Sequence, residues 1–352
     1  MAEVVGQSEV LPYVPSKAPY DAEAFARTYE AAKAPLRKKR LLATFAEYGE
    51  FIHALRKLPR VRFVPMRELL SPGQDDHVRC ALRFDVDMDP IAAVRLARFN
   101  ARYGLCGSFY LLHTAMYYGV FDENGFVRNP RLREWVRALV LAGAEIGLHI
   151  DPLTVYFLHH RDGLESVRTE LNWLRTGGVS VNGVAAHNSY PLFGAENFEI
   201  FREYTTAERS ALTVNGVSCP LGSVPLADWE LTYEANYPKP PGRKIITGWF
   251  RKKPQRWMTK QVSDAVNNRA WMRTYLLDNP VYDRAYTVRV WYHGPGRWTL
   301  ANAGRFVSRS WLWQVDLATM LEAVQAARPA STVVFHLHPV YFAADTDVSY
   351  EL

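Results

Sequence analysis

Carboxylate and imidazole side chains recur at four separated points of the chain, each at the end of a short apolar run. In chain order they are Asp85, Asp87, His149, Asp151, His187, His336 and His338. A mixed set of these donors with an open position suits catalytic zinc or another first-row metal. A carboxylate beside such a metal can take a proton from water, and a histidine can return one near neutral pH. The residue types therefore predict metal-assisted hydrolysis.

Thiolate chemistry is not expected. The three cysteines, Cys80, Cys106 and Cys219, show no CxxC spacing and leave an odd one. Such a set predicts neither a disulfide framework nor a cysteine-built zinc site. A metal site in this chain would therefore be built from aspartate and histidine.

The segments between these points predict strands and helices in alternation. The predicted strands cover 78–84, 107–112, 144–148, 181–186 and 332–335. The predicted helices cover 90–103, 130–143, 164–177 and 316–327. Asp89 is the expected cap of the first helix, with Pro90 at its first position. In the second helix, an amphipathic stripe is formed by Leu132, Trp135, Val136, Leu139 and Val140.

Alternating elements with short links predict parallel βα units, which place active-site residues at the carboxyl ends of the strands. We divide the chain into an N-terminal arm and helical extension over 1–75 and a barrel-like domain over 76–352. The stretch from about 225 to 298 is rich in proline, tryptophan, tyrosine and basic residues, and it interrupts the alternation. We expect an irregular insertion there.

Three motifs at predicted strand ends resemble those of a known family. FDVDMD, GAEIGLHID and FHLHP, in this order, are similar to the motifs of the polysaccharide deacetylase superfamily, carbohydrate esterase family four and its relatives. The resemblance covers about residues 78–200 and the last 25 residues. It implies an α/β fold, a distorted (β/α) barrel with fewer than eight regular strands. It also implies a divalent metal cofactor, with zinc expected and other first-row metals as alternatives.

The resemblance also implies residue roles. Asp85 would be the general base, and Asp87 and His149 would be metal ligands. His338 would be the general acid or the group that stabilises it. The preceding His336 is not expected to contribute: strand alternation puts both histidines on one side, and only the one at the strand exit reaches the site.

The third metal ligand departs from the family pattern. The family has a second histidine three or four residues after the first, whereas this chain has Pro-Leu-Thr at 152–154. His187, at the end of a later strand, is our preferred replacement. His159 and His160 are the competitors, although they are expected to be surface or loop residues, and Asp151 could also close the coordination sphere.

Three candidate substrate-binding residues are chosen for their position in the sequence. Asn188 comes directly after His187. Arg297 and Trp298 lie in a turn-rich block, where an arginine could orient a carboxylate or phosphate and an aromatic ring could pack against a sugar. Core packing of long loops is the alternative role for most of the ten tryptophans.

Composition excludes several classes of protein. With 48% hydrophobic residues, the 352-residue chain is too apolar to be disordered. Its net charge of +6 is spread out rather than gathered in a basic stripe, so a nucleic-acid partner is not expected. No secretory signal and no apolar run of membrane-spanning length is evident, which predicts a cytoplasmic location.

Together these features predict a metal-dependent carbohydrate N-deacetylase. The expected substrate is an amino sugar, an oligosaccharide or a sugar-containing metabolite that loses an N-acyl group, with acetyl as the first candidate. The alternative is a non-catalytic or repurposed relative that binds a glycan precursor in the same cleft. The missing histidine of the second motif favours this alternative, and the retained pair of aspartates with His338 opposes it.

Overall fold

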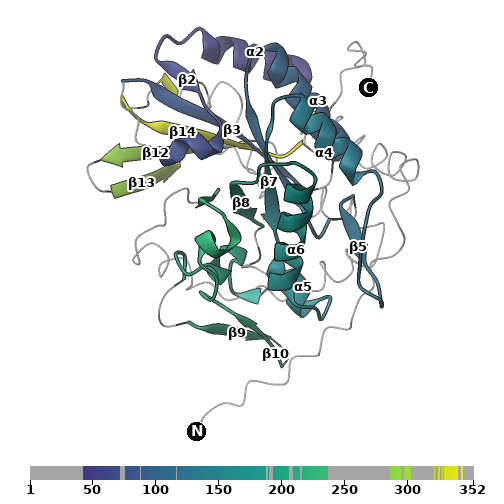
Figure 1. Cartoon of the computed structure of the whole chain (residues 1–352). Coiled ribbons are helices and arrows are strands. Elements are labelled where there is room, and N and C mark those ends of the chain that lie inside the picture. The colour runs from purple at the N-terminus through teal and green to yellow at the C-terminus, as the bar shows by residue number, and fades with distance from the viewer. Residues whose placement is uncertain are drawn as a thin grey trace, which may run out of the picture.

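The computed structural model describes most of the chain between residues 43 and 343 (Figure 1). The described residues are 43–71, 76–87, 89–115, 117–187, 189, 193–205, 209–214, 216–236, 286–294, 297–302, 321, 324, 325, 327, 329–339 and 342–343. The expected N-terminal arm and most of the predicted helix over 316–327 lie outside them. Within the described residues, no helix has both the length and the apolar character needed to cross a bilayer.

One curled sheet organises the molecule. Its strands follow the order β11-β8-β7-β4-β3-β14-β12-β13, and β2 pairs with the beginning of β3. The strand bounds are β2 Val61–Phe63, β3 Val78–Val86, β4 Gly107–Leu112, β7 Glu145–Ile150, β8 Gly183–Ala186, β11 Tyr233–Glu234, β12 Tyr286–Gly294, β13 Arg297–Asn302 and β14 Thr332–Leu337. From β11 to β14, and at β2, every pairing is parallel, whereas β12 runs antiparallel to both of its neighbours.

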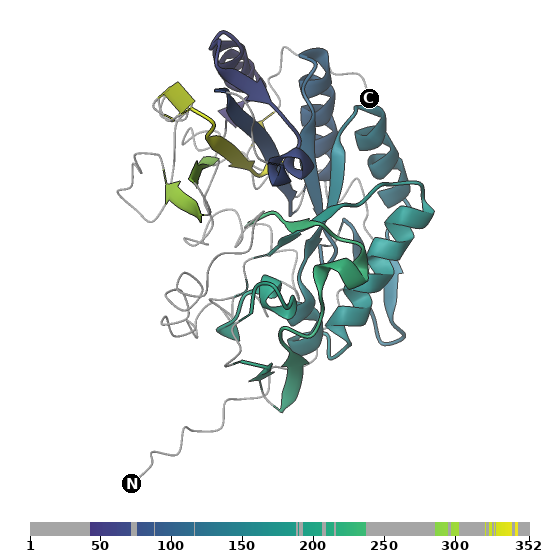
Figure 2. The same cartoon turned by 60° about the vertical axis from the view of Figure 1, so that its left-hand side comes forward.

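This arrangement is a mixed α/β fold built on a curled, mainly parallel sheet (Figures 1 and 2). Among the described strands, no pairing joins β11 to β13, so the sheet is open at that point. The predicted α/β class is confirmed, and the half-barrel is compatible with a distorted barrel.

Helices cover the outer face of the sheet. Their bounds are α2 Phe45–Arg56, α3 Pro90–Arg102, α4 Leu132–Leu141, α5 Pro152–Phe157 and α6 Gly163–Thr176. From α2, the ring of Phe51 meets Phe335 of β14 edge-on at 5.1 Å, and Tyr48 packs edge-on against Phe84 of β3. These buried aromatic contacts fix the helix layer against β3 and β14.

Short elements complete the fold. They are β1 Ala43–Thr44 with β15 Phe342–Ala343, the hairpins β5 Gly119–Phe121 with β6 Phe126–Arg128 and β9 Ala211–Val214 with β10 Val217–Pro220, and the 3-10 helices η1 Met66–Leu70, η2 Asn197–Ile200 and η3 Leu226–Trp229. Of these, η2 matters for the site because it carries Asn197 beside the metal-binding candidates.

Strand alternation separates the core from the polar residues. On β3, Phe84 faces the helix layer and stacks on Phe109 of β4 with ring centroids 4.5 Å apart. Its neighbours Arg83 and Asp85 point to the opposite face and bond to each other. Since side chains of a strand alternate between faces, this inner face collects Arg83, Asp85 and, just past the strand, Asp87.

Most predicted elements are confirmed. A strand is present at each of the five predicted positions, and β3, β7 and β14 each run two residues further than expected. The cap of α3 is also confirmed, since Asp89 Oδ1 accepts a hydrogen bond from the Ala92 amide at 2.8 Å. The local signals of a short apolar run and a capping aspartate were sufficient for these elements.

Two local expectations need correction. Val140 was assigned to the buried stripe of α4 but is 43% exposed. An α-helix turns by about 100° per residue, which places Val140 at the edge of the stripe defined by Leu132 and Leu139. In addition, the short helix α5 was not predicted; it begins where Asp151 caps it, with Pro152 at its first position.

The stretch from 225 to 298 contributes to the main sheet. β11 pairs in parallel with β8, and β12 pairs with β14 over six residue pairs. These strands are part of the architecture, although the residues between 237 and 285 lie outside the described part of the chain.

Two glycines make room for tyrosines inside the curled sheet. A Cβ atom on Gly183 would lie 2.1 Å from Cζ of Tyr233, and one on Gly147 would lie 2.4 Å from Cδ1 of Tyr110. Each glycine is the register partner of that tyrosine on the neighbouring strand. The hydroxyl groups of Tyr110 and Tyr233 meet at 2.8 Å, so the two rings form a buried layer below the polar residues.

We expect Gly183→Ala to destabilise the fold by about 1–3 kcal/mol, because overpacking a buried site forces neighbouring groups to move. Gly177→Ala, at the end of α6, is the matched control: its Cβ would lie 3.2 Å from the Leu174 carbonyl oxygen. Urea unfolding of both variants checks the prediction. Equal midpoints for the two variants would contradict it.

Candidate metal centre

Two groups of three side chains meet at the carboxyl ends of the parallel strands. The first triad is Asp87, His149 and His187, and the second triad is Asp85, His336 and His338. Within each triad, one potential ligand atom per residue lies within 4.8 Å of the others. The residues come from β3, β7, β8 and β14 or from the positions directly after them.

His149 directs its Nε2 atom toward a carboxylate. Its Nδ1 lies 2.7 Å from the carbonyl oxygen of Ala185, and since a carbonyl only accepts, Nδ1 carries the hydrogen. In the neutral ring, Nε2 is then an acceptor, and it lies 3.2 Å from Oδ1 of Asp87. A proton on Nε2 or a metal ion between the two atoms would compensate the buried charge of Asp87.

His187 is oriented in the same manner by a carboxylate. Its Nδ1 lies 3.1 Å from Oδ2 of Asp151, which leaves Nε2 as the ligand atom of the neutral ring. Its ring meets that of His149 edge-on, with centroids 5.2 Å apart. A partner on the far nitrogen of each histidine is the usual support of a metal-binding imidazole.

Asp151 is itself held by a buried shell of hydrogen bonds. Asn197 donates from Nδ2 to Oδ1 of Asp151 at 2.8 Å and to the His187 carbonyl oxygen at 2.9 Å. Thr114 donates to the other carboxylate oxygen, and His113 Nε2 accepts from the Asp151 amide at 2.8 Å. These contacts join the loops after three strands and fix the position of His187.

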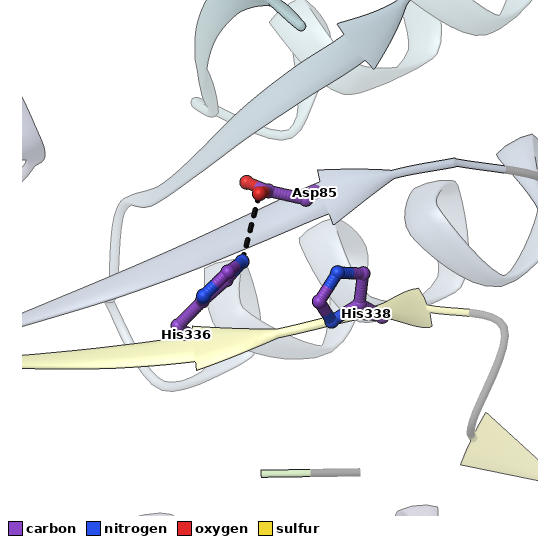
Figure 3. A group of neighbouring side chains, drawn as sticks. All are labelled: Asp85, His336 and His338. Carbon is purple, nitrogen blue, oxygen red and sulfur yellow. Dashed lines mark hydrogen bonds and ion pairs between the residues drawn. The ribbon is translucent and has the colours of Figure 1, made fainter. Parts of the chain in front are cut away.

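The second triad is centred on an arginine–aspartate pair. Nε and Nη2 of Arg83 donate to the two oxygens of Asp85 at 2.7 and 2.6 Å. Nε2 of His336 lies 2.7 Å from the same Asp85 Oδ2, and the ring of His336 points from β14 toward Asp85 (Figure 3). All three side chains are largely buried.

The two triads adjoin each other. Nε2 of His149 lies 3.6 Å from Oδ2 of Asp85, and Nε2 of His338 lies 3.6 Å from Oδ2 of Asp87. His338 also lies beside His336, with ring centroids 4.8 Å apart. A group bound at the first triad would therefore have both Asp85 and His338 as neighbours.

The electrostatics keep the aspartates ionised. Burial alone would raise the pKa of Asp85, but Arg83 and the nearby histidines hold that pKa well below its usual value. For Asp87, burial is likewise outweighed, here by His338, His149 and His187, and the pKa is lowered. Both carboxylates are therefore negatively charged at neutral pH.

The pKa values of the histidines shift in different directions. Burial lowers the pKa of His187, but its bond to Asp151 and the charges of Asp151, Asp87 and Asp85 outweigh this effect and raise the pKa to about 9. Burial lowers the pKa of His338 and, together with Arg83, that of His336, so both are neutral at pH 7. Without a metal, His187 is therefore protonated at pH 7, and a metal ion at the first triad would displace that proton from Nε2.

The first triad fits a divalent metal. Two ligands about 2.0–2.1 Å from a tetrahedral ion lie about 3.3 Å apart, and the distance between Asp87 Oδ1 and His149 Nε2 is 3.2 Å. Asp87 and His149 are buried, whereas the side chain of His187 is 13% exposed, so the triad opens toward solvent on that side. Two imidazoles and one carboxylate with an open side are a zinc donor set.

The structure brings together Asp85, Asp87, His149, His187 and His338. Asn188 lies outside the described residues, and Arg297 and Trp298 begin β13, of which the backbone alone is described.

Three expectations for the remaining residues were wrong or incomplete. His336 was set aside, yet it contacts Asp85, because β14 pairs with β3 in a register that puts His336 opposite Arg83. His159 was expected to be a surface or loop residue; it does lie in the loop between α5 and α6, but it is buried there and stacks on Phe121 with centroids 4.3 Å apart. Asp151 supports His187 rather than joining the first triad.

Comparison with protein-family models, with curated proteins and with solved structures gives no match for this chain. The function must therefore be argued from the site itself.

We expect Asp151→Asn to weaken metal binding by about 10–100-fold, the usual cost of losing an outer partner of a metal-binding histidine. Asparagine keeps the shape of the side chain but removes the charge that orients His187. Competition with a chromogenic chelator measures the change. Asp162→Asn, which alters the exposed cap of α6, is the matched control and should leave the affinity unchanged. Equal affinities in the two variants would contradict the role of Asp151.

Proposed function

We propose that this chain is a metal-dependent hydrolase that removes an N-acyl group, with acetyl as the first candidate, from an amino sugar or a sugar-containing metabolite. The observation that carries the proposal is the first triad, where Nε2 of His149 lies 3.2 Å from Oδ1 of Asp87 and the Nε2 of His187 completes the donor set. The buried carboxylate of Asp85 lies next to this triad, 3.6 Å from Nε2 of His149. The motif resemblance to polysaccharide deacetylases supports the same reaction and a deacetylase-type barrel.

Asp87, His149 and His187 would hold the metal, for which zinc is the first candidate. A divalent ion bound there supplies Lewis-acid chemistry, because it activates water and polarises the carbonyl group of the amide. The side of the triad on which His187 is partly exposed is where substrate would enter.

Asp85 is placed to accept the proton of the attacking water. An ionised carboxylate has about four acceptor positions. Arg83 Nε, Arg83 Nη2 and His336 Nε2 occupy three of them, which leaves one for a water beside the first triad. The charge of Arg83 lowers the pKa of Asp85. A proton that the carboxylate takes from water is therefore readily released to another group.

His338 would protonate the leaving amine. Since burial lowers its pKa, its imidazole is neutral at pH 7 and must first gain a proton during the reaction. Its Nε2 lies 3.6 Å from Oδ2 of Asp87, whereas His149 faces Oδ1 of the same carboxylate. His338 therefore flanks the first triad and can deliver the proton to a nitrogen bound there.

Acetate release tests the proposal. The purified protein, loaded with one equivalent of Zn²⁺, would be incubated with N-acetylated amino sugars in free, nucleotide-linked and oligomeric form. We expect acetate and a free amine from at least one of these classes. Removal of the metal by a chelator should abolish the reaction and Zn²⁺ should restore it. A metal-loaded protein that binds these sugars without releasing acetate would favour the non-catalytic alternative.

A further inference from the structure

The second triad has the donor set of another metal site. Asp85, His336 and His338 supply one carboxylate and two imidazoles, the same combination as the first triad. The two triads adjoin at two contacts of 3.6 Å, Asp85 to His149 and Asp87 to His338. Many hydrolases with such neighbouring donor sets hold two metal ions about 3.5–4 Å apart. The donor atoms alone would therefore allow two ions here.

Arg83 distinguishes the second triad from the first. Its guanidinium binds Asp85 through two parallel hydrogen bonds of 2.6 and 2.7 Å, and its side chain is only 1% exposed. An arginine remains charged under all conditions in which the protein is folded. The charge of Asp85 is thus already compensated by a permanent cation.

The guanidinium is also fixed in place. Its Nη1 donates to Oδ1 of Asn236 at 2.9 Å, and it lies 5.6 Å from the centroid of the Tyr110 ring. Tyr110 is in turn held by its bond to Tyr233. A rigid cation cannot withdraw to make room for a second ion, and two positive charges sharing one buried carboxylate repel each other strongly.

We propose that Arg83 acts as a built-in cation that excludes a metal ion from the second triad, so that the protein binds one divalent metal and not two. The inference rests on the proposed metal at the first triad. It makes Arg83 the residue that sets metal stoichiometry, and it predicts that a neutral side chain at this position turns Asp85, His336 and His338 into a second metal site.

Metal stoichiometry tests this inference. Each protein would be loaded with excess Zn²⁺ and desalted, and its zinc would be measured by elemental analysis. We expect one equivalent in the wild type and in Arg83→Lys, which keeps the positive charge. We expect two in Arg83→Gln, and one again in the double variant Arg83→Gln/His336→Ala. A folded Arg83→Gln variant with one equivalent would overturn the inference.

A second measurement covers the case in which Arg83→Gln does not fold. The wild-type chain would be titrated with ¹¹³Cd²⁺ and followed by cadmium NMR. One resonance that saturates at one equivalent is expected, whereas a second resonance at two equivalents overturns the role of Arg83. Absence of any bound metal in the wild type would instead contradict the proposed function. The two failures are therefore distinguishable.

Discussion

Replacing Asp87 by alanine is expected to strip the protein of its metal and to abolish hydrolysis. Asp87 is the single carboxylate of the first triad, and its Oδ1 faces Nε2 of His149. Loss of an outer partner of a ligand costs about 10–100-fold in affinity, so loss of a ligand itself should cost more than that. Elemental analysis after dialysis and an acetate-release assay measure the two effects.

Asp89→Ala is the matched control for this substitution. It removes a carboxylate two residues further on, which caps α3 and belongs to neither triad. We expect it to lower the free energy of unfolding by about 1 kcal/mol, the usual cost of losing a capping side chain, and to leave metal content unchanged. An Asp87→Ala protein that retained one equivalent of zinc would show that the metal lies elsewhere.

Asp85→Asn should separate catalysis from metal binding. We expect the variant to keep its metal, because Asp85 is not in the first triad, and to lose about 10²–10⁴-fold in rate, the usual contribution of a general base. Its free energy of unfolding should also fall by as much as about 3–5 kcal/mol, since Arg83 is left buried without its counter-charge. Metal analysis, initial rates and urea unfolding give the three readouts.

The double variant Arg83→Met/Asp85→Leu separates the two effects of Asp85. Replacing both members of a buried ion pair by apolar residues of similar size is often neutral for stability. We therefore expect stability to return toward that of the wild type while hydrolysis remains lost. If Asp85→Asn kept full activity, Asp85 would not be the base; if it lost its metal, Asp85 would be a ligand.

The parts of this centre that sequence patterns predicted share a local signal. Each of Asp85, Asp87, His149, His187 and His338 ends or follows a short apolar run, which identifies a buried strand and its exit. Since the carboxyl ends of parallel strands meet at one edge of a sheet, the strand order alone brings such residues together. The cap of α3 is equally local, because Asp89 and Pro90 are adjacent.

The residues that were missed depend on contacts between strands. The contact of His336 with Asp85 appears only when β14 pairs with β3 in the register that places His336 opposite Arg83. Arg83 itself lies two residues before Asp85 on the same strand face, so strand alternation already predicts their contact. Asn197 belongs to η2, far along the chain from Asp151, and no pattern connects the two. Such partners depend on how loops from different strands pack, which the sequence spacing does not encode.

The glycine–tyrosine layer shows the same limit. Gly183 weakens the strand pattern of β8 when it is considered alone. In the fold, however, the ring of Tyr233 on β11 lies directly against Gly183 and leaves no room for a side chain there. Tyr233 is 50 residues further along the chain. The strand signal of β8 is therefore weak because the contact with Tyr233 requires a glycine at position 183.

In the proposed centre, Asp87, His149 and His187 together hold one divalent metal. Anomalous diffraction at the zinc absorption edge, from crystals of the zinc-loaded wild-type protein, tests it most directly. We expect a single anomalous peak bounded by Asp87 Oδ1, His149 Nε2 and His187 Nε2. Absence of a peak there, or a peak between Asp85 and His336, would contradict it.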